Sequence, residues 1–245
     1  MKQAHIALDS SVNTSYCLLP GDPKRLDHIK QYLNDVKELA YNREYRSIIG
    51  TYQGIPILAM STGMGGASVG IAVEELKNIG VTNLIRIGSC GALQKQIQIG
   101  DLVIAEGAIR DDGASKAYVE EIYPATPDST LLRYIIEASQ SLDVAYHLGI
   151  VHSHESFYID DNQVIEEYWS NKGVLGADLE TSALLTIGRL RGCRCASILN
   201  NVVVYGQDTA ESISNYVDGQ DMAYEGEKRE ILVALEAFVR LEQSR

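Results

Sequence analysis

One apolar run restricts the fold of this chain more than any other stretch. Residues 84–92 read Leu-Ile-Arg-Ile-Gly-Ser-Cys-Gly-Ala, so a strand-like apolar segment ends abruptly in glycines. A strand without polar alternation is typical of a sheet that is covered on both faces. The run therefore predicts an α/β protein whose helices cover both faces of a central sheet.

Arg86 is an unusual residue for such a strand, because a buried guanidinium is costly unless it meets an anion. Just after it, Gly88, Ser89 and Gly91 permit a tight turn and offer N–H and hydroxyl donors. They would lie at the carboxyl end of the strand, where open α/β sheets bind ligands, and they suit phosphate or another oxyanion. Alternatively, Arg86 pairs with a carboxylate of the core, and this stretch alone favours neither interpretation.

Size and charge narrow the class of protein. The 245 residues suffice for a sizeable core and for one α/β domain over residues 1–245. A net charge of −12 argues against a nucleic-acid surface, so an anionic ligand would need a local cluster of arginines. No apolar run approaches the length of a membrane span, and we expect no membrane association. Four cysteines within apolar runs indicate reduced thiols and a cytoplasmic location.

A second strand-to-helix junction lies near the start of the chain. An apolar strand at residues 16–19 runs into Pro-Gly-Asp-Pro-Lys-Arg at residues 20–25. Pro23 is well placed to begin a helix, whose free amides and dipole would attract an anion, and Arg25 could reach the same place. The alternative is a surface turn with a solvated Arg25, which this stretch alone favours.

A third glycine-rich junction covers residues 61–68 and leads into a helix with an apolar stripe. Its glycines indicate either close approach of the backbone to a ligand or another chain, or simple tight packing. A hairpin precedes it, with strands at residues 45–51 and 55–60 joined around Gln53 and Gly54.

Strands and helices continue to alternate in the second half of the chain. The expected strands are 101–105, 147–153 and 196–204, and the expected helices are 131–138, 182–191 and 225–241. His152 and His154 alternate along a strand without further ligands at metal-site spacing, so we expect no metal site. Asp178 and Glu180 lie at a strand-to-helix junction, where carboxylates can bind hydroxyl groups or complement a helix dipole.

Together, five motifs resemble those of the nucleoside phosphorylase family, which contains uridine phosphorylase and the hexameric purine nucleoside phosphorylases. They occupy residues 20–25, 40–45, 61–65, 85–91 and 178–181. The resemblance runs from His5 to the last helix and implies a single-domain, three-layer α/β/α fold with a central mixed, partly barrel-like sheet. It also implies a pentosyltransferase of nucleoside salvage, which uses phosphate to cleave a purine nucleoside or uridine into free base and ribose 1-phosphate.

The resemblance further implies where phosphate and ribose bind. Its phosphate positions are Gly21, Arg25, Arg86, Ser89 and, from the neighbouring subunit, Arg43. Three arginines would neutralise and orient the phosphate dianion. Its ribose positions are Leu179, Glu180 and, from the neighbour, His5. Arg86, Glu180 and Asp208 are the expected catalytic residues, and the carboxylate at 180 would favour an oxocarbenium-like transition state.

The base is the part that the resemblance leaves open. Phe157 and Tyr158 would form the aromatic wall. Uridine phosphorylases read uracil through a glutamine and an arginine, and Asp161 and Gln163 occupy those positions here. A carboxylate there would accept from purine N–H groups and repel uracil carbonyl oxygens.

Purine enzymes of the family instead use an aspartate just past a late strand to protonate the purine N7. Tyr205 occupies that position, and Asp208, three residues on, is the nearest carboxyl group. It would need a pKa raised by burial to act as an acid. Water or Tyr205 is the alternative proton donor. Neither base-recognition set is complete, so both purine and uracil remain open.

Assembly and alternative functions complete the expectations. Because Arg43 and His5 would cross a subunit boundary, a dimer is the smallest active unit, and a hexamer built of such dimers is expected. The resemblance implies phosphate as co-substrate, no cofactor, and potassium as a candidate ion at Glu44, Met64 and Ser68. A hydrolytic nucleosidase and a non-catalytic storage or ligand-binding relative are the alternatives; the three arginines argue against the first.

Overall fold

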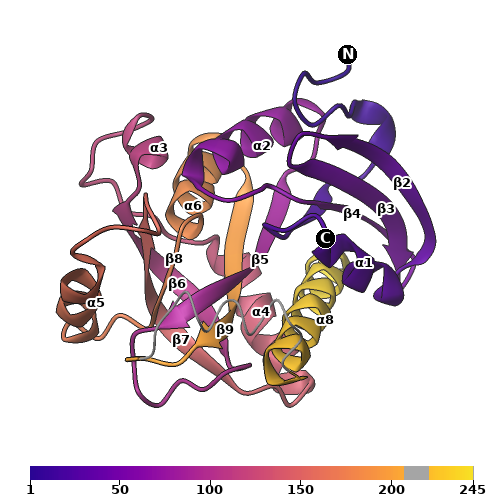
Figure 1. Ribbon diagram of the computed structural model, residues 1–245. Helices are drawn as coiled ribbons and strands as arrows, with labels where there is room; N and C mark the ends of the chain where they lie inside the picture. Colours follow the sequence, from indigo (N-terminus) through magenta and orange to yellow (C-terminus); the bar gives the residue numbers. More distant parts are fainter. Residues whose placement is uncertain (207–220, 245) are drawn as a thin grey trace.

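The computed structural model describes residues 1–206 and 221–244, and Figure 1 shows helices arranged around a large sheet. Its strands are β1 (Tyr16–Leu19), β2 (Asn34–Asn42), β3 (Tyr45–Tyr52), β4 (Ile55–Met60), β5 (Asn83–Ala92), β6 (Leu102–Asp111), β7 (Tyr146–His154), β8 (Gly176–Asp178) and β9 (Arg194–Val203). Its helices are α1 (Arg25–Ile29), α2 (Gly66–Asn78), α3 (Gly113–Lys116), α4 (Ser129–Ser141), α5 (Asn162–Ser170), α6 (Thr181–Leu190) and α8 (Asp221–Gln243).

The sheet is mixed and partly closed. Its strand order is β2-β3-β4-β1-β5-β8-β7-β6-β9, and β5 also pairs with β9, which joins the last five strands into a barrel-like ring. β1 and β5 are parallel neighbours, with Leu19 opposite Arg86. Their carboxyl ends therefore reach the same edge of the sheet, next to the turn that follows β1.

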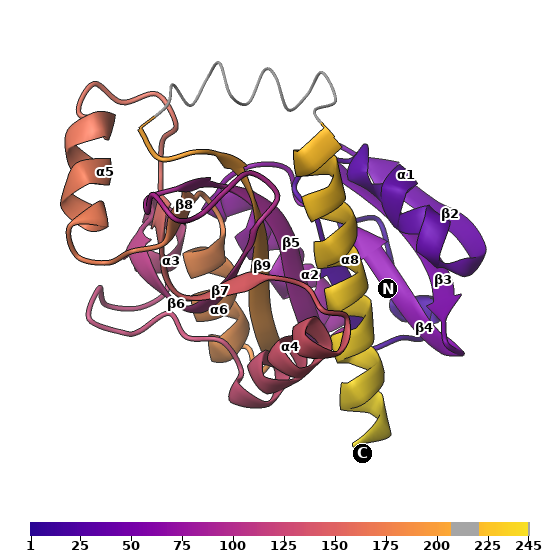
Figure 2. The same ribbon diagram turned by 90° about the horizontal axis from the view of Figure 1, so that it is seen from below.

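The central strands are buried because helices cover both of their faces. Tyr16 and Leu18 pack into one core cluster with residues of α4 and α8. Cys17, the next residue on the other face, packs with α2 and α6. Figure 2 shows α8 beside α4, and Figure 1 shows α2 beside α6. The predicted three-layer α/β/α architecture with a partly barrel-like sheet is thereby confirmed.

The predicted hairpin is present, and its turn explains the sequence. β3 and β4 pair in antiparallel register, and the turn between them consists of Gln53 and Gly54. Both residues have positive φ angles, 49° and 81°, as the two-residue turns that match strand twist require. The apolar pattern of the flanking strands and the glycine therefore predict the same local structure.

The elements that the sequence does not predict bury few side chains. The sequence predicts neither β2, a mostly exposed edge strand, nor α5, which has no buried residue, nor the four-residue α3. The predicted strand 101–105 extends to Asp111. The helix expected to begin at Pro23 spans only Arg25–Ile29 and is followed by a 3₁₀ turn. Periodicity reports burial, so an element that lies at the surface gives a weak signal.

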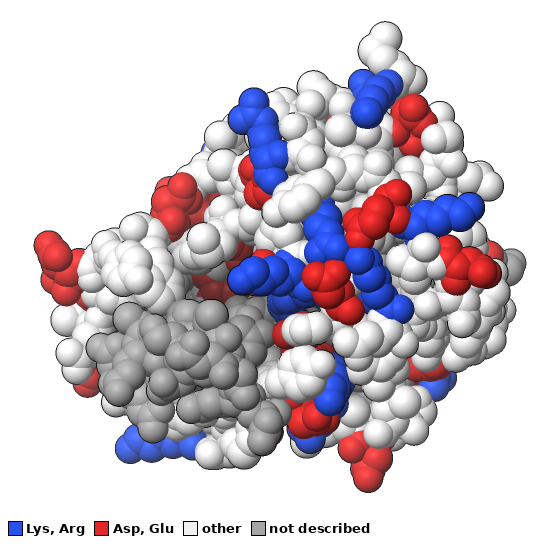
Figure 3. All heavy atoms as spheres, turned by 45° about the vertical axis from the view of Figure 1, so that its right-hand side comes forward, with Lys and Arg blue, Asp and Glu red and all other residues white. Residues whose placement is uncertain are grey.

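The face that carries α1 and β2 has mixed charge. Figure 3 shows Lys and Arg groups next to Asp and Glu groups on this face rather than a continuous basic patch. Arg46, for example, pairs with Asp27 at 2.7 Å and with Glu38 at 2.8 Å. All four cysteines are buried and unpaired. Within residues 1–206 and 221–244, no helix has the length and apolar character needed to cross a bilayer.

Candidate active site

A cavity of about 750 Å³ lies at the carboxyl ends of β1 and β5. Its walls come from the turn after β1, from the end of β5, from the β8–α6 junction, and from α5 and α8. Volumes of this order are typical of small-molecule sites. Among its lining residues are Gly21, Arg25, Arg86, Ser89, Phe157, Leu179 and Glu180.

Arg86 lines this cavity and is only 4% exposed. Its Nε lies 3.1 Å from Asp178 Oδ2, and its Nη2 lies 2.6 Å from Glu180 Oε2. Two residues on, a Cβ on Gly88 would come within 2.5 Å of the Arg86 Cζ. Glycine is therefore needed at 88 so that the guanidinium can fold back along the strand.

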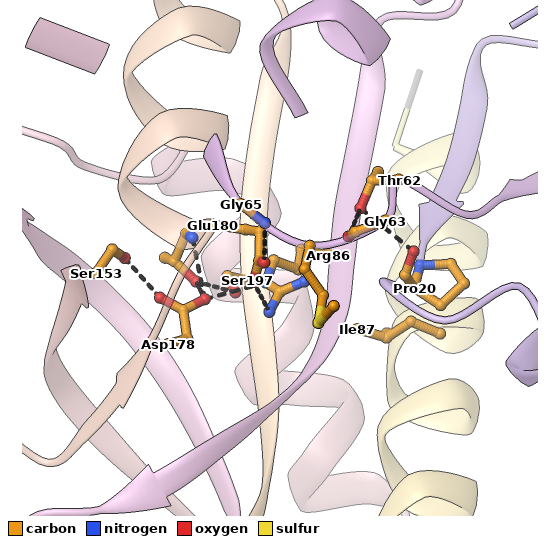
Figure 4. Close-up of polar contacts among 12 residues, drawn as sticks. Pro20, Thr62, Gly63, Gly65, Arg86, Ile87, Ser153, Asp178, Glu180 and Ser197 are labelled. Atoms are coloured by element: carbon orange, nitrogen blue, oxygen red, sulfur yellow. Dashed lines mark hydrogen bonds and ion pairs between the residues drawn. The ribbon is translucent and has the colours of Figure 1, made fainter. Parts of the chain in front are cut away.

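Each carboxylate of this cluster is fixed by its own partners (Figure 4). Asp178 accepts hydrogen bonds from Ser153 Oγ at 2.5 Å and from Thr181 Oγ1 at 2.6 Å. Glu180 accepts one from Gly65 N at 2.5 Å, at the N-terminus of α2. The 61–68 junction thus meets the β8–α6 junction at Glu180. Gly65 has a positive φ of 94°, and a Cβ there would meet no atom within 4 Å, so backbone conformation rather than close packing explains this glycine.

Burial and charge act against each other in this cluster. Burial disfavours the charge of Arg86, but the attraction of Glu180 and Asp178 is stronger, and the pKa of Arg86 is raised. Burial also raises the pKa of Glu180 by more than Arg86 lowers it, and Asp178 adds to the rise. Two carboxylates therefore share one guanidinium in a cavity that is open to a ligand.

Arg25 approaches the same cavity from the turn after β1. It is 6% exposed, and its Nη1 donates to the carbonyl oxygen of Ile87 at 3.1 Å. Its guanidinium pairs with two carboxylates of α8, Glu230 and Glu227, the latter at 3.3 Å. The alternative of a solvated Arg25 on a surface turn is therefore wrong: the residue is buried and lines the cavity.

Two residues with predicted roles lie away from this cavity. Arg43 is exposed at the turn between β2 and β3, in a left-handed conformation with φ 56°. His5 pairs with Glu75, with 2.7 Å between His5 Nδ1 and Glu75 Oε1. Neither lines the cavity of its own chain, which is compatible with the expectation that both act in a neighbour.

The residues that line the cavity next to α5 differ from those that the sequence predicts. Phe157 lines it, whereas Tyr158 is 83% exposed and contacts the Phe157 ring edge-on. Asp161 and Gln163 do not line the cavity; Asn162 and Glu166 do. The last two are four residues apart on α5 and therefore share one face of the helix. Recognising α5 as a helix would have indicated this pair.

Two predicted positions remain, Tyr205 and Asp208. Tyr205 does not line the cavity; it packs against a small core cluster that includes the cavity-lining Cys90, while Val202 and Tyr224 line the cavity. Asp208 lies outside the described residues.

At the candidate cation site, Ser68 Oγ donates to the carbonyl oxygen of Met64 at 3.3 Å. The side chain of Glu44 packs against Gly63, next to Met64. The described residues contain no cluster of three or more His, Cys, Asp or Glu that could hold a metal ion.

Comparison with known proteins agrees with this geometry. Residues 15–222 match the family model of the phosphorylase superfamily. The chain is 38% identical to uridine phosphorylase of Thermococcus kodakarensis, over 96% of this chain and 85% of that protein. It is 32% identical to guanosine phosphorylase of Halorubrum lacusprofundi, over 98% and 99%.

A solved structure of similar length extends the comparison to the fold. The structure of uridine phosphorylase from Vibrio fischeri covers 98% of each chain with a TM-score of 0.91 and 46% identity. The family match spans most of the chain, and the relatives align over almost its whole length. The chain therefore belongs to the phosphorylase superfamily, among its nucleoside phosphorylases.

Proposed function

We propose that this chain is a nucleoside phosphorylase that transfers a ribosyl group from a base to inorganic phosphate. The observation that carries the proposal is the convergence of Arg25 and Arg86 on one cavity, together with Gly21 and Ser89, beside the carboxylate of Glu180. Relatives named uridine phosphorylase and guanosine phosphorylase support it. The products are a free base and ribose 1-phosphate.

The residues divide the reaction between them. A phosphate oxygen attacks C1′ of the ribose while the bond from C1′ to the base nitrogen breaks, and the base leaves with that electron pair and takes up a proton. Arg25, Arg86 and Ser89 hold and orient the phosphate. Glu180 accepts hydrogen bonds from ribose hydroxyls, and its negative charge stabilises the oxocarbenium-like sugar of the transition state.

Both arginines pair with carboxylates of the chain. Phosphate must therefore share these guanidinium groups with Glu180 and with the α8 carboxylates. Ribose hydroxyls that donate to Glu180 would loosen its hold on Arg86, so binding of nucleoside and binding of phosphate should favour each other.

The site also bears on the two alternative functions, a hydrolytic nucleosidase and a storage protein. A nucleosidase that uses water needs no cluster of buried arginines beside the sugar site. A storage protein would gain nothing from a carboxylate placed against such a cluster. We therefore place phosphorolysis first, in an enzyme of nucleoside salvage that acts in the cytoplasm.

We further propose that the active unit contains at least two chains. Arg43 and His5 lie outside the cavity of their own chain, on exposed or half-exposed segments. A neighbour in a symmetric dimer could bring both to the cavity, and hexamers of three such dimers would keep this contact. One of the candidate potassium ligands Glu44, Met64 and Ser68 is the residue next to Arg43: Glu44 follows it directly in the chain.

Phosphate dependence tests the function. Release of free base from guanosine, inosine, adenosine and uridine is measured with and without phosphate, and ribose 1-phosphate is assayed directly. Arg86→Lys keeps a charge beside Asp178 and Glu180 but loses the two-pronged geometry, and it should lower kcat/KM by about 100-fold or more. Arg191→Lys, on a surface pair with Glu74, is the control. Equal turnover without phosphate would contradict the proposal.

A further inference from the structure

We propose that the Asn162–Glu166 pair on α5 reads the base, and that it selects purines with guanine preferred. This inference rests on the proposed phosphorylase function and names its substrate. It concerns two residues that sequence reasoning passed over in favour of Asp161 and Gln163.

The cavity has a direction that places the base near α5. Arg25 lines the cavity next to the carboxylates of α8, Arg86 and Glu180 line it from β5 and the β8–α6 junction, and Asn162 and Glu166 line it from α5. Figure 1 shows α5 on the opposite side of the molecule from α1 and α8. Attack at C1′ requires the nucleophile and the leaving group on opposite sides of that carbon. With phosphate at Arg25 and ribose at Glu180, the base therefore extends toward Phe157 and α5.

At that end, Asn162 and Glu166 form a joint hydrogen-bonding group. Asn162 Nδ2 donates to Glu166 Oε1 at 2.7 Å, and both residues line the cavity. This bond orients the amide and the carboxylate together on one face of the helix. It uses one of two amide N–H groups and one carboxylate oxygen. The pair can therefore present a donor beside an acceptor of full negative charge.

Guanine matches this pair better than the other bases do. Its N1–H and N2–H are adjacent donors for a carboxylate, and its O6 is an acceptor for the amide. Hypoxanthine and adenine each offer one donor and one acceptor, so each makes fewer bonds. Uracil offers its single N3–H between two carbonyl oxygens, one of which would face the carboxylate of Glu166. A site with a fixed polar group discriminates against a base that leaves it unpaired.

The test compares four nucleosides on three proteins at saturating phosphate. The wild type should show its highest kcat/KM with guanosine. Glu166→Gln should lower the kcat/KM for guanosine by about 10- to 100-fold, the loss of a charged hydrogen-bond acceptor. The value for uridine should stay within about threefold of the wild type or rise. Glu167→Gln is the matched control, because Glu167 is the next residue of α5 and is exposed.

Binding gives a readout that does not depend on turnover. Calorimetry with guanosine in phosphate-free buffer should show weaker binding to Glu166→Gln than to the wild type or to Glu167→Gln. A wild-type preference for uridine, or equal effects of Glu166→Gln on all four nucleosides, would overturn the inference and leave phosphorolysis standing. Absence of phosphorolysis of any nucleoside by the wild type would overturn both.

Discussion

The two ends of the cavity are built in different ways. At the phosphate end, Arg25 and Arg86 are buried, and each is held by two carboxylates. At the base end, α5 has no buried residue and contributes Asn162 and Glu166 from its half-buried face. The part that performs the chemistry is thus continuous with the core, whereas the part that selects the substrate lies on a peripheral helix.

This difference has consequences for how each end tolerates change. Removing one partner of a buried ion pair costs about 3–5 kcal/mol, because the other charge remains buried and unpaired. A substitution on an exposed helix face usually changes stability by less than about 0.5 kcal/mol. The base end can therefore change its side chains with little effect on folding. Relatives named uridine phosphorylase and guanosine phosphorylase fit a family in which the base varies.

The largest expected effect would show that the phosphate end is incomplete in one chain. Arg43→Ala and Glu180→Ala should each be almost inactive alone. When the two variants are mixed and exchange subunits, each mixed dimer has one site with both residues intact. At equal amounts, about a quarter of all sites should then regain activity. The measurement is phosphorolysis before and after exchange.

Two controls support this experiment. Exchange is followed independently with differently tagged chains. Each variant mixed with itself should stay inactive. No recovery in verified mixed dimers would place Arg43 outside the neighbour's site and leave the phosphate end to Arg25 and Arg86 alone.

A smaller effect concerns the charge of Glu180, on which the phosphate and ribose end depends. Burial holds the pKa of Glu180 above its usual value of 4.5. Activity needs the ionised carboxylate, so kcat/KM for the nucleoside should fall as the pH drops through that raised pKa. Stability should respond in the opposite direction: the native state binds this proton more tightly than the unfolded state, so the contribution of Glu180 declines as the pH rises.

The pH profile is measured at saturating phosphate with the nucleoside varied. The acid limb of kcat/KM should lie above pH 4.5, and it should be the same in Glu166→Gln, whose change is confined to the base end. A shift of the acid limb in Glu166→Gln would show that the two ends of the cavity are electrostatically coupled, which would contradict the contrast between them.

The same contrast explains what the sequence could predict. Arg86 within an apolar run, followed by Gly88, has few structural explanations, and the structure places it in the cavity with Asp178 and Glu180. The interpretation in which Arg86 pairs with carboxylates is confirmed, and both carboxylates line the same cavity, while binding of an anion by Arg86 stays a prediction. A charged residue that must be buried leaves a pattern in the sequence, here an arginine within an apolar run that is followed by a glycine.

The base end gave no comparable pattern. α5 buries no side chain, so the sequence shows little helical periodicity there. The positions that correspond to the uracil-binding pair are Asp161 and Gln163, whereas the residues that line the cavity are Asn162 and Glu166. The roles proposed for Arg43 and His5 rest on the resemblance alone, because a contact between chains leaves no mark on periodicity within one chain.

The smallest expected effect is that of potassium on Tm, at its proposed site. Glu44, the carbonyl group of Met64 and Ser68 Oγ supply oxygen atoms, which hard cations prefer. We expect this site at the interface of the proposed dimer, so binding of potassium would stabilise the assembly. With potassium at tenfold its dissociation constant, linkage gives about 1.4 kcal/mol, or a rise in Tm of roughly 3–5 °C.

Tm is therefore compared in potassium, sodium and choline chloride at equal ionic strength. Glu44→Gln should abolish the increment, and Glu167→Gln should retain it. Because Glu44 packs against Gly63, next to the glycine loop that holds Glu180, loss of the ion could also reach the sugar site. An increment in Tm without a change in KM for phosphate or nucleoside would confine the ion to assembly. An unchanged Tm in all three salts would remove the ion from the protein.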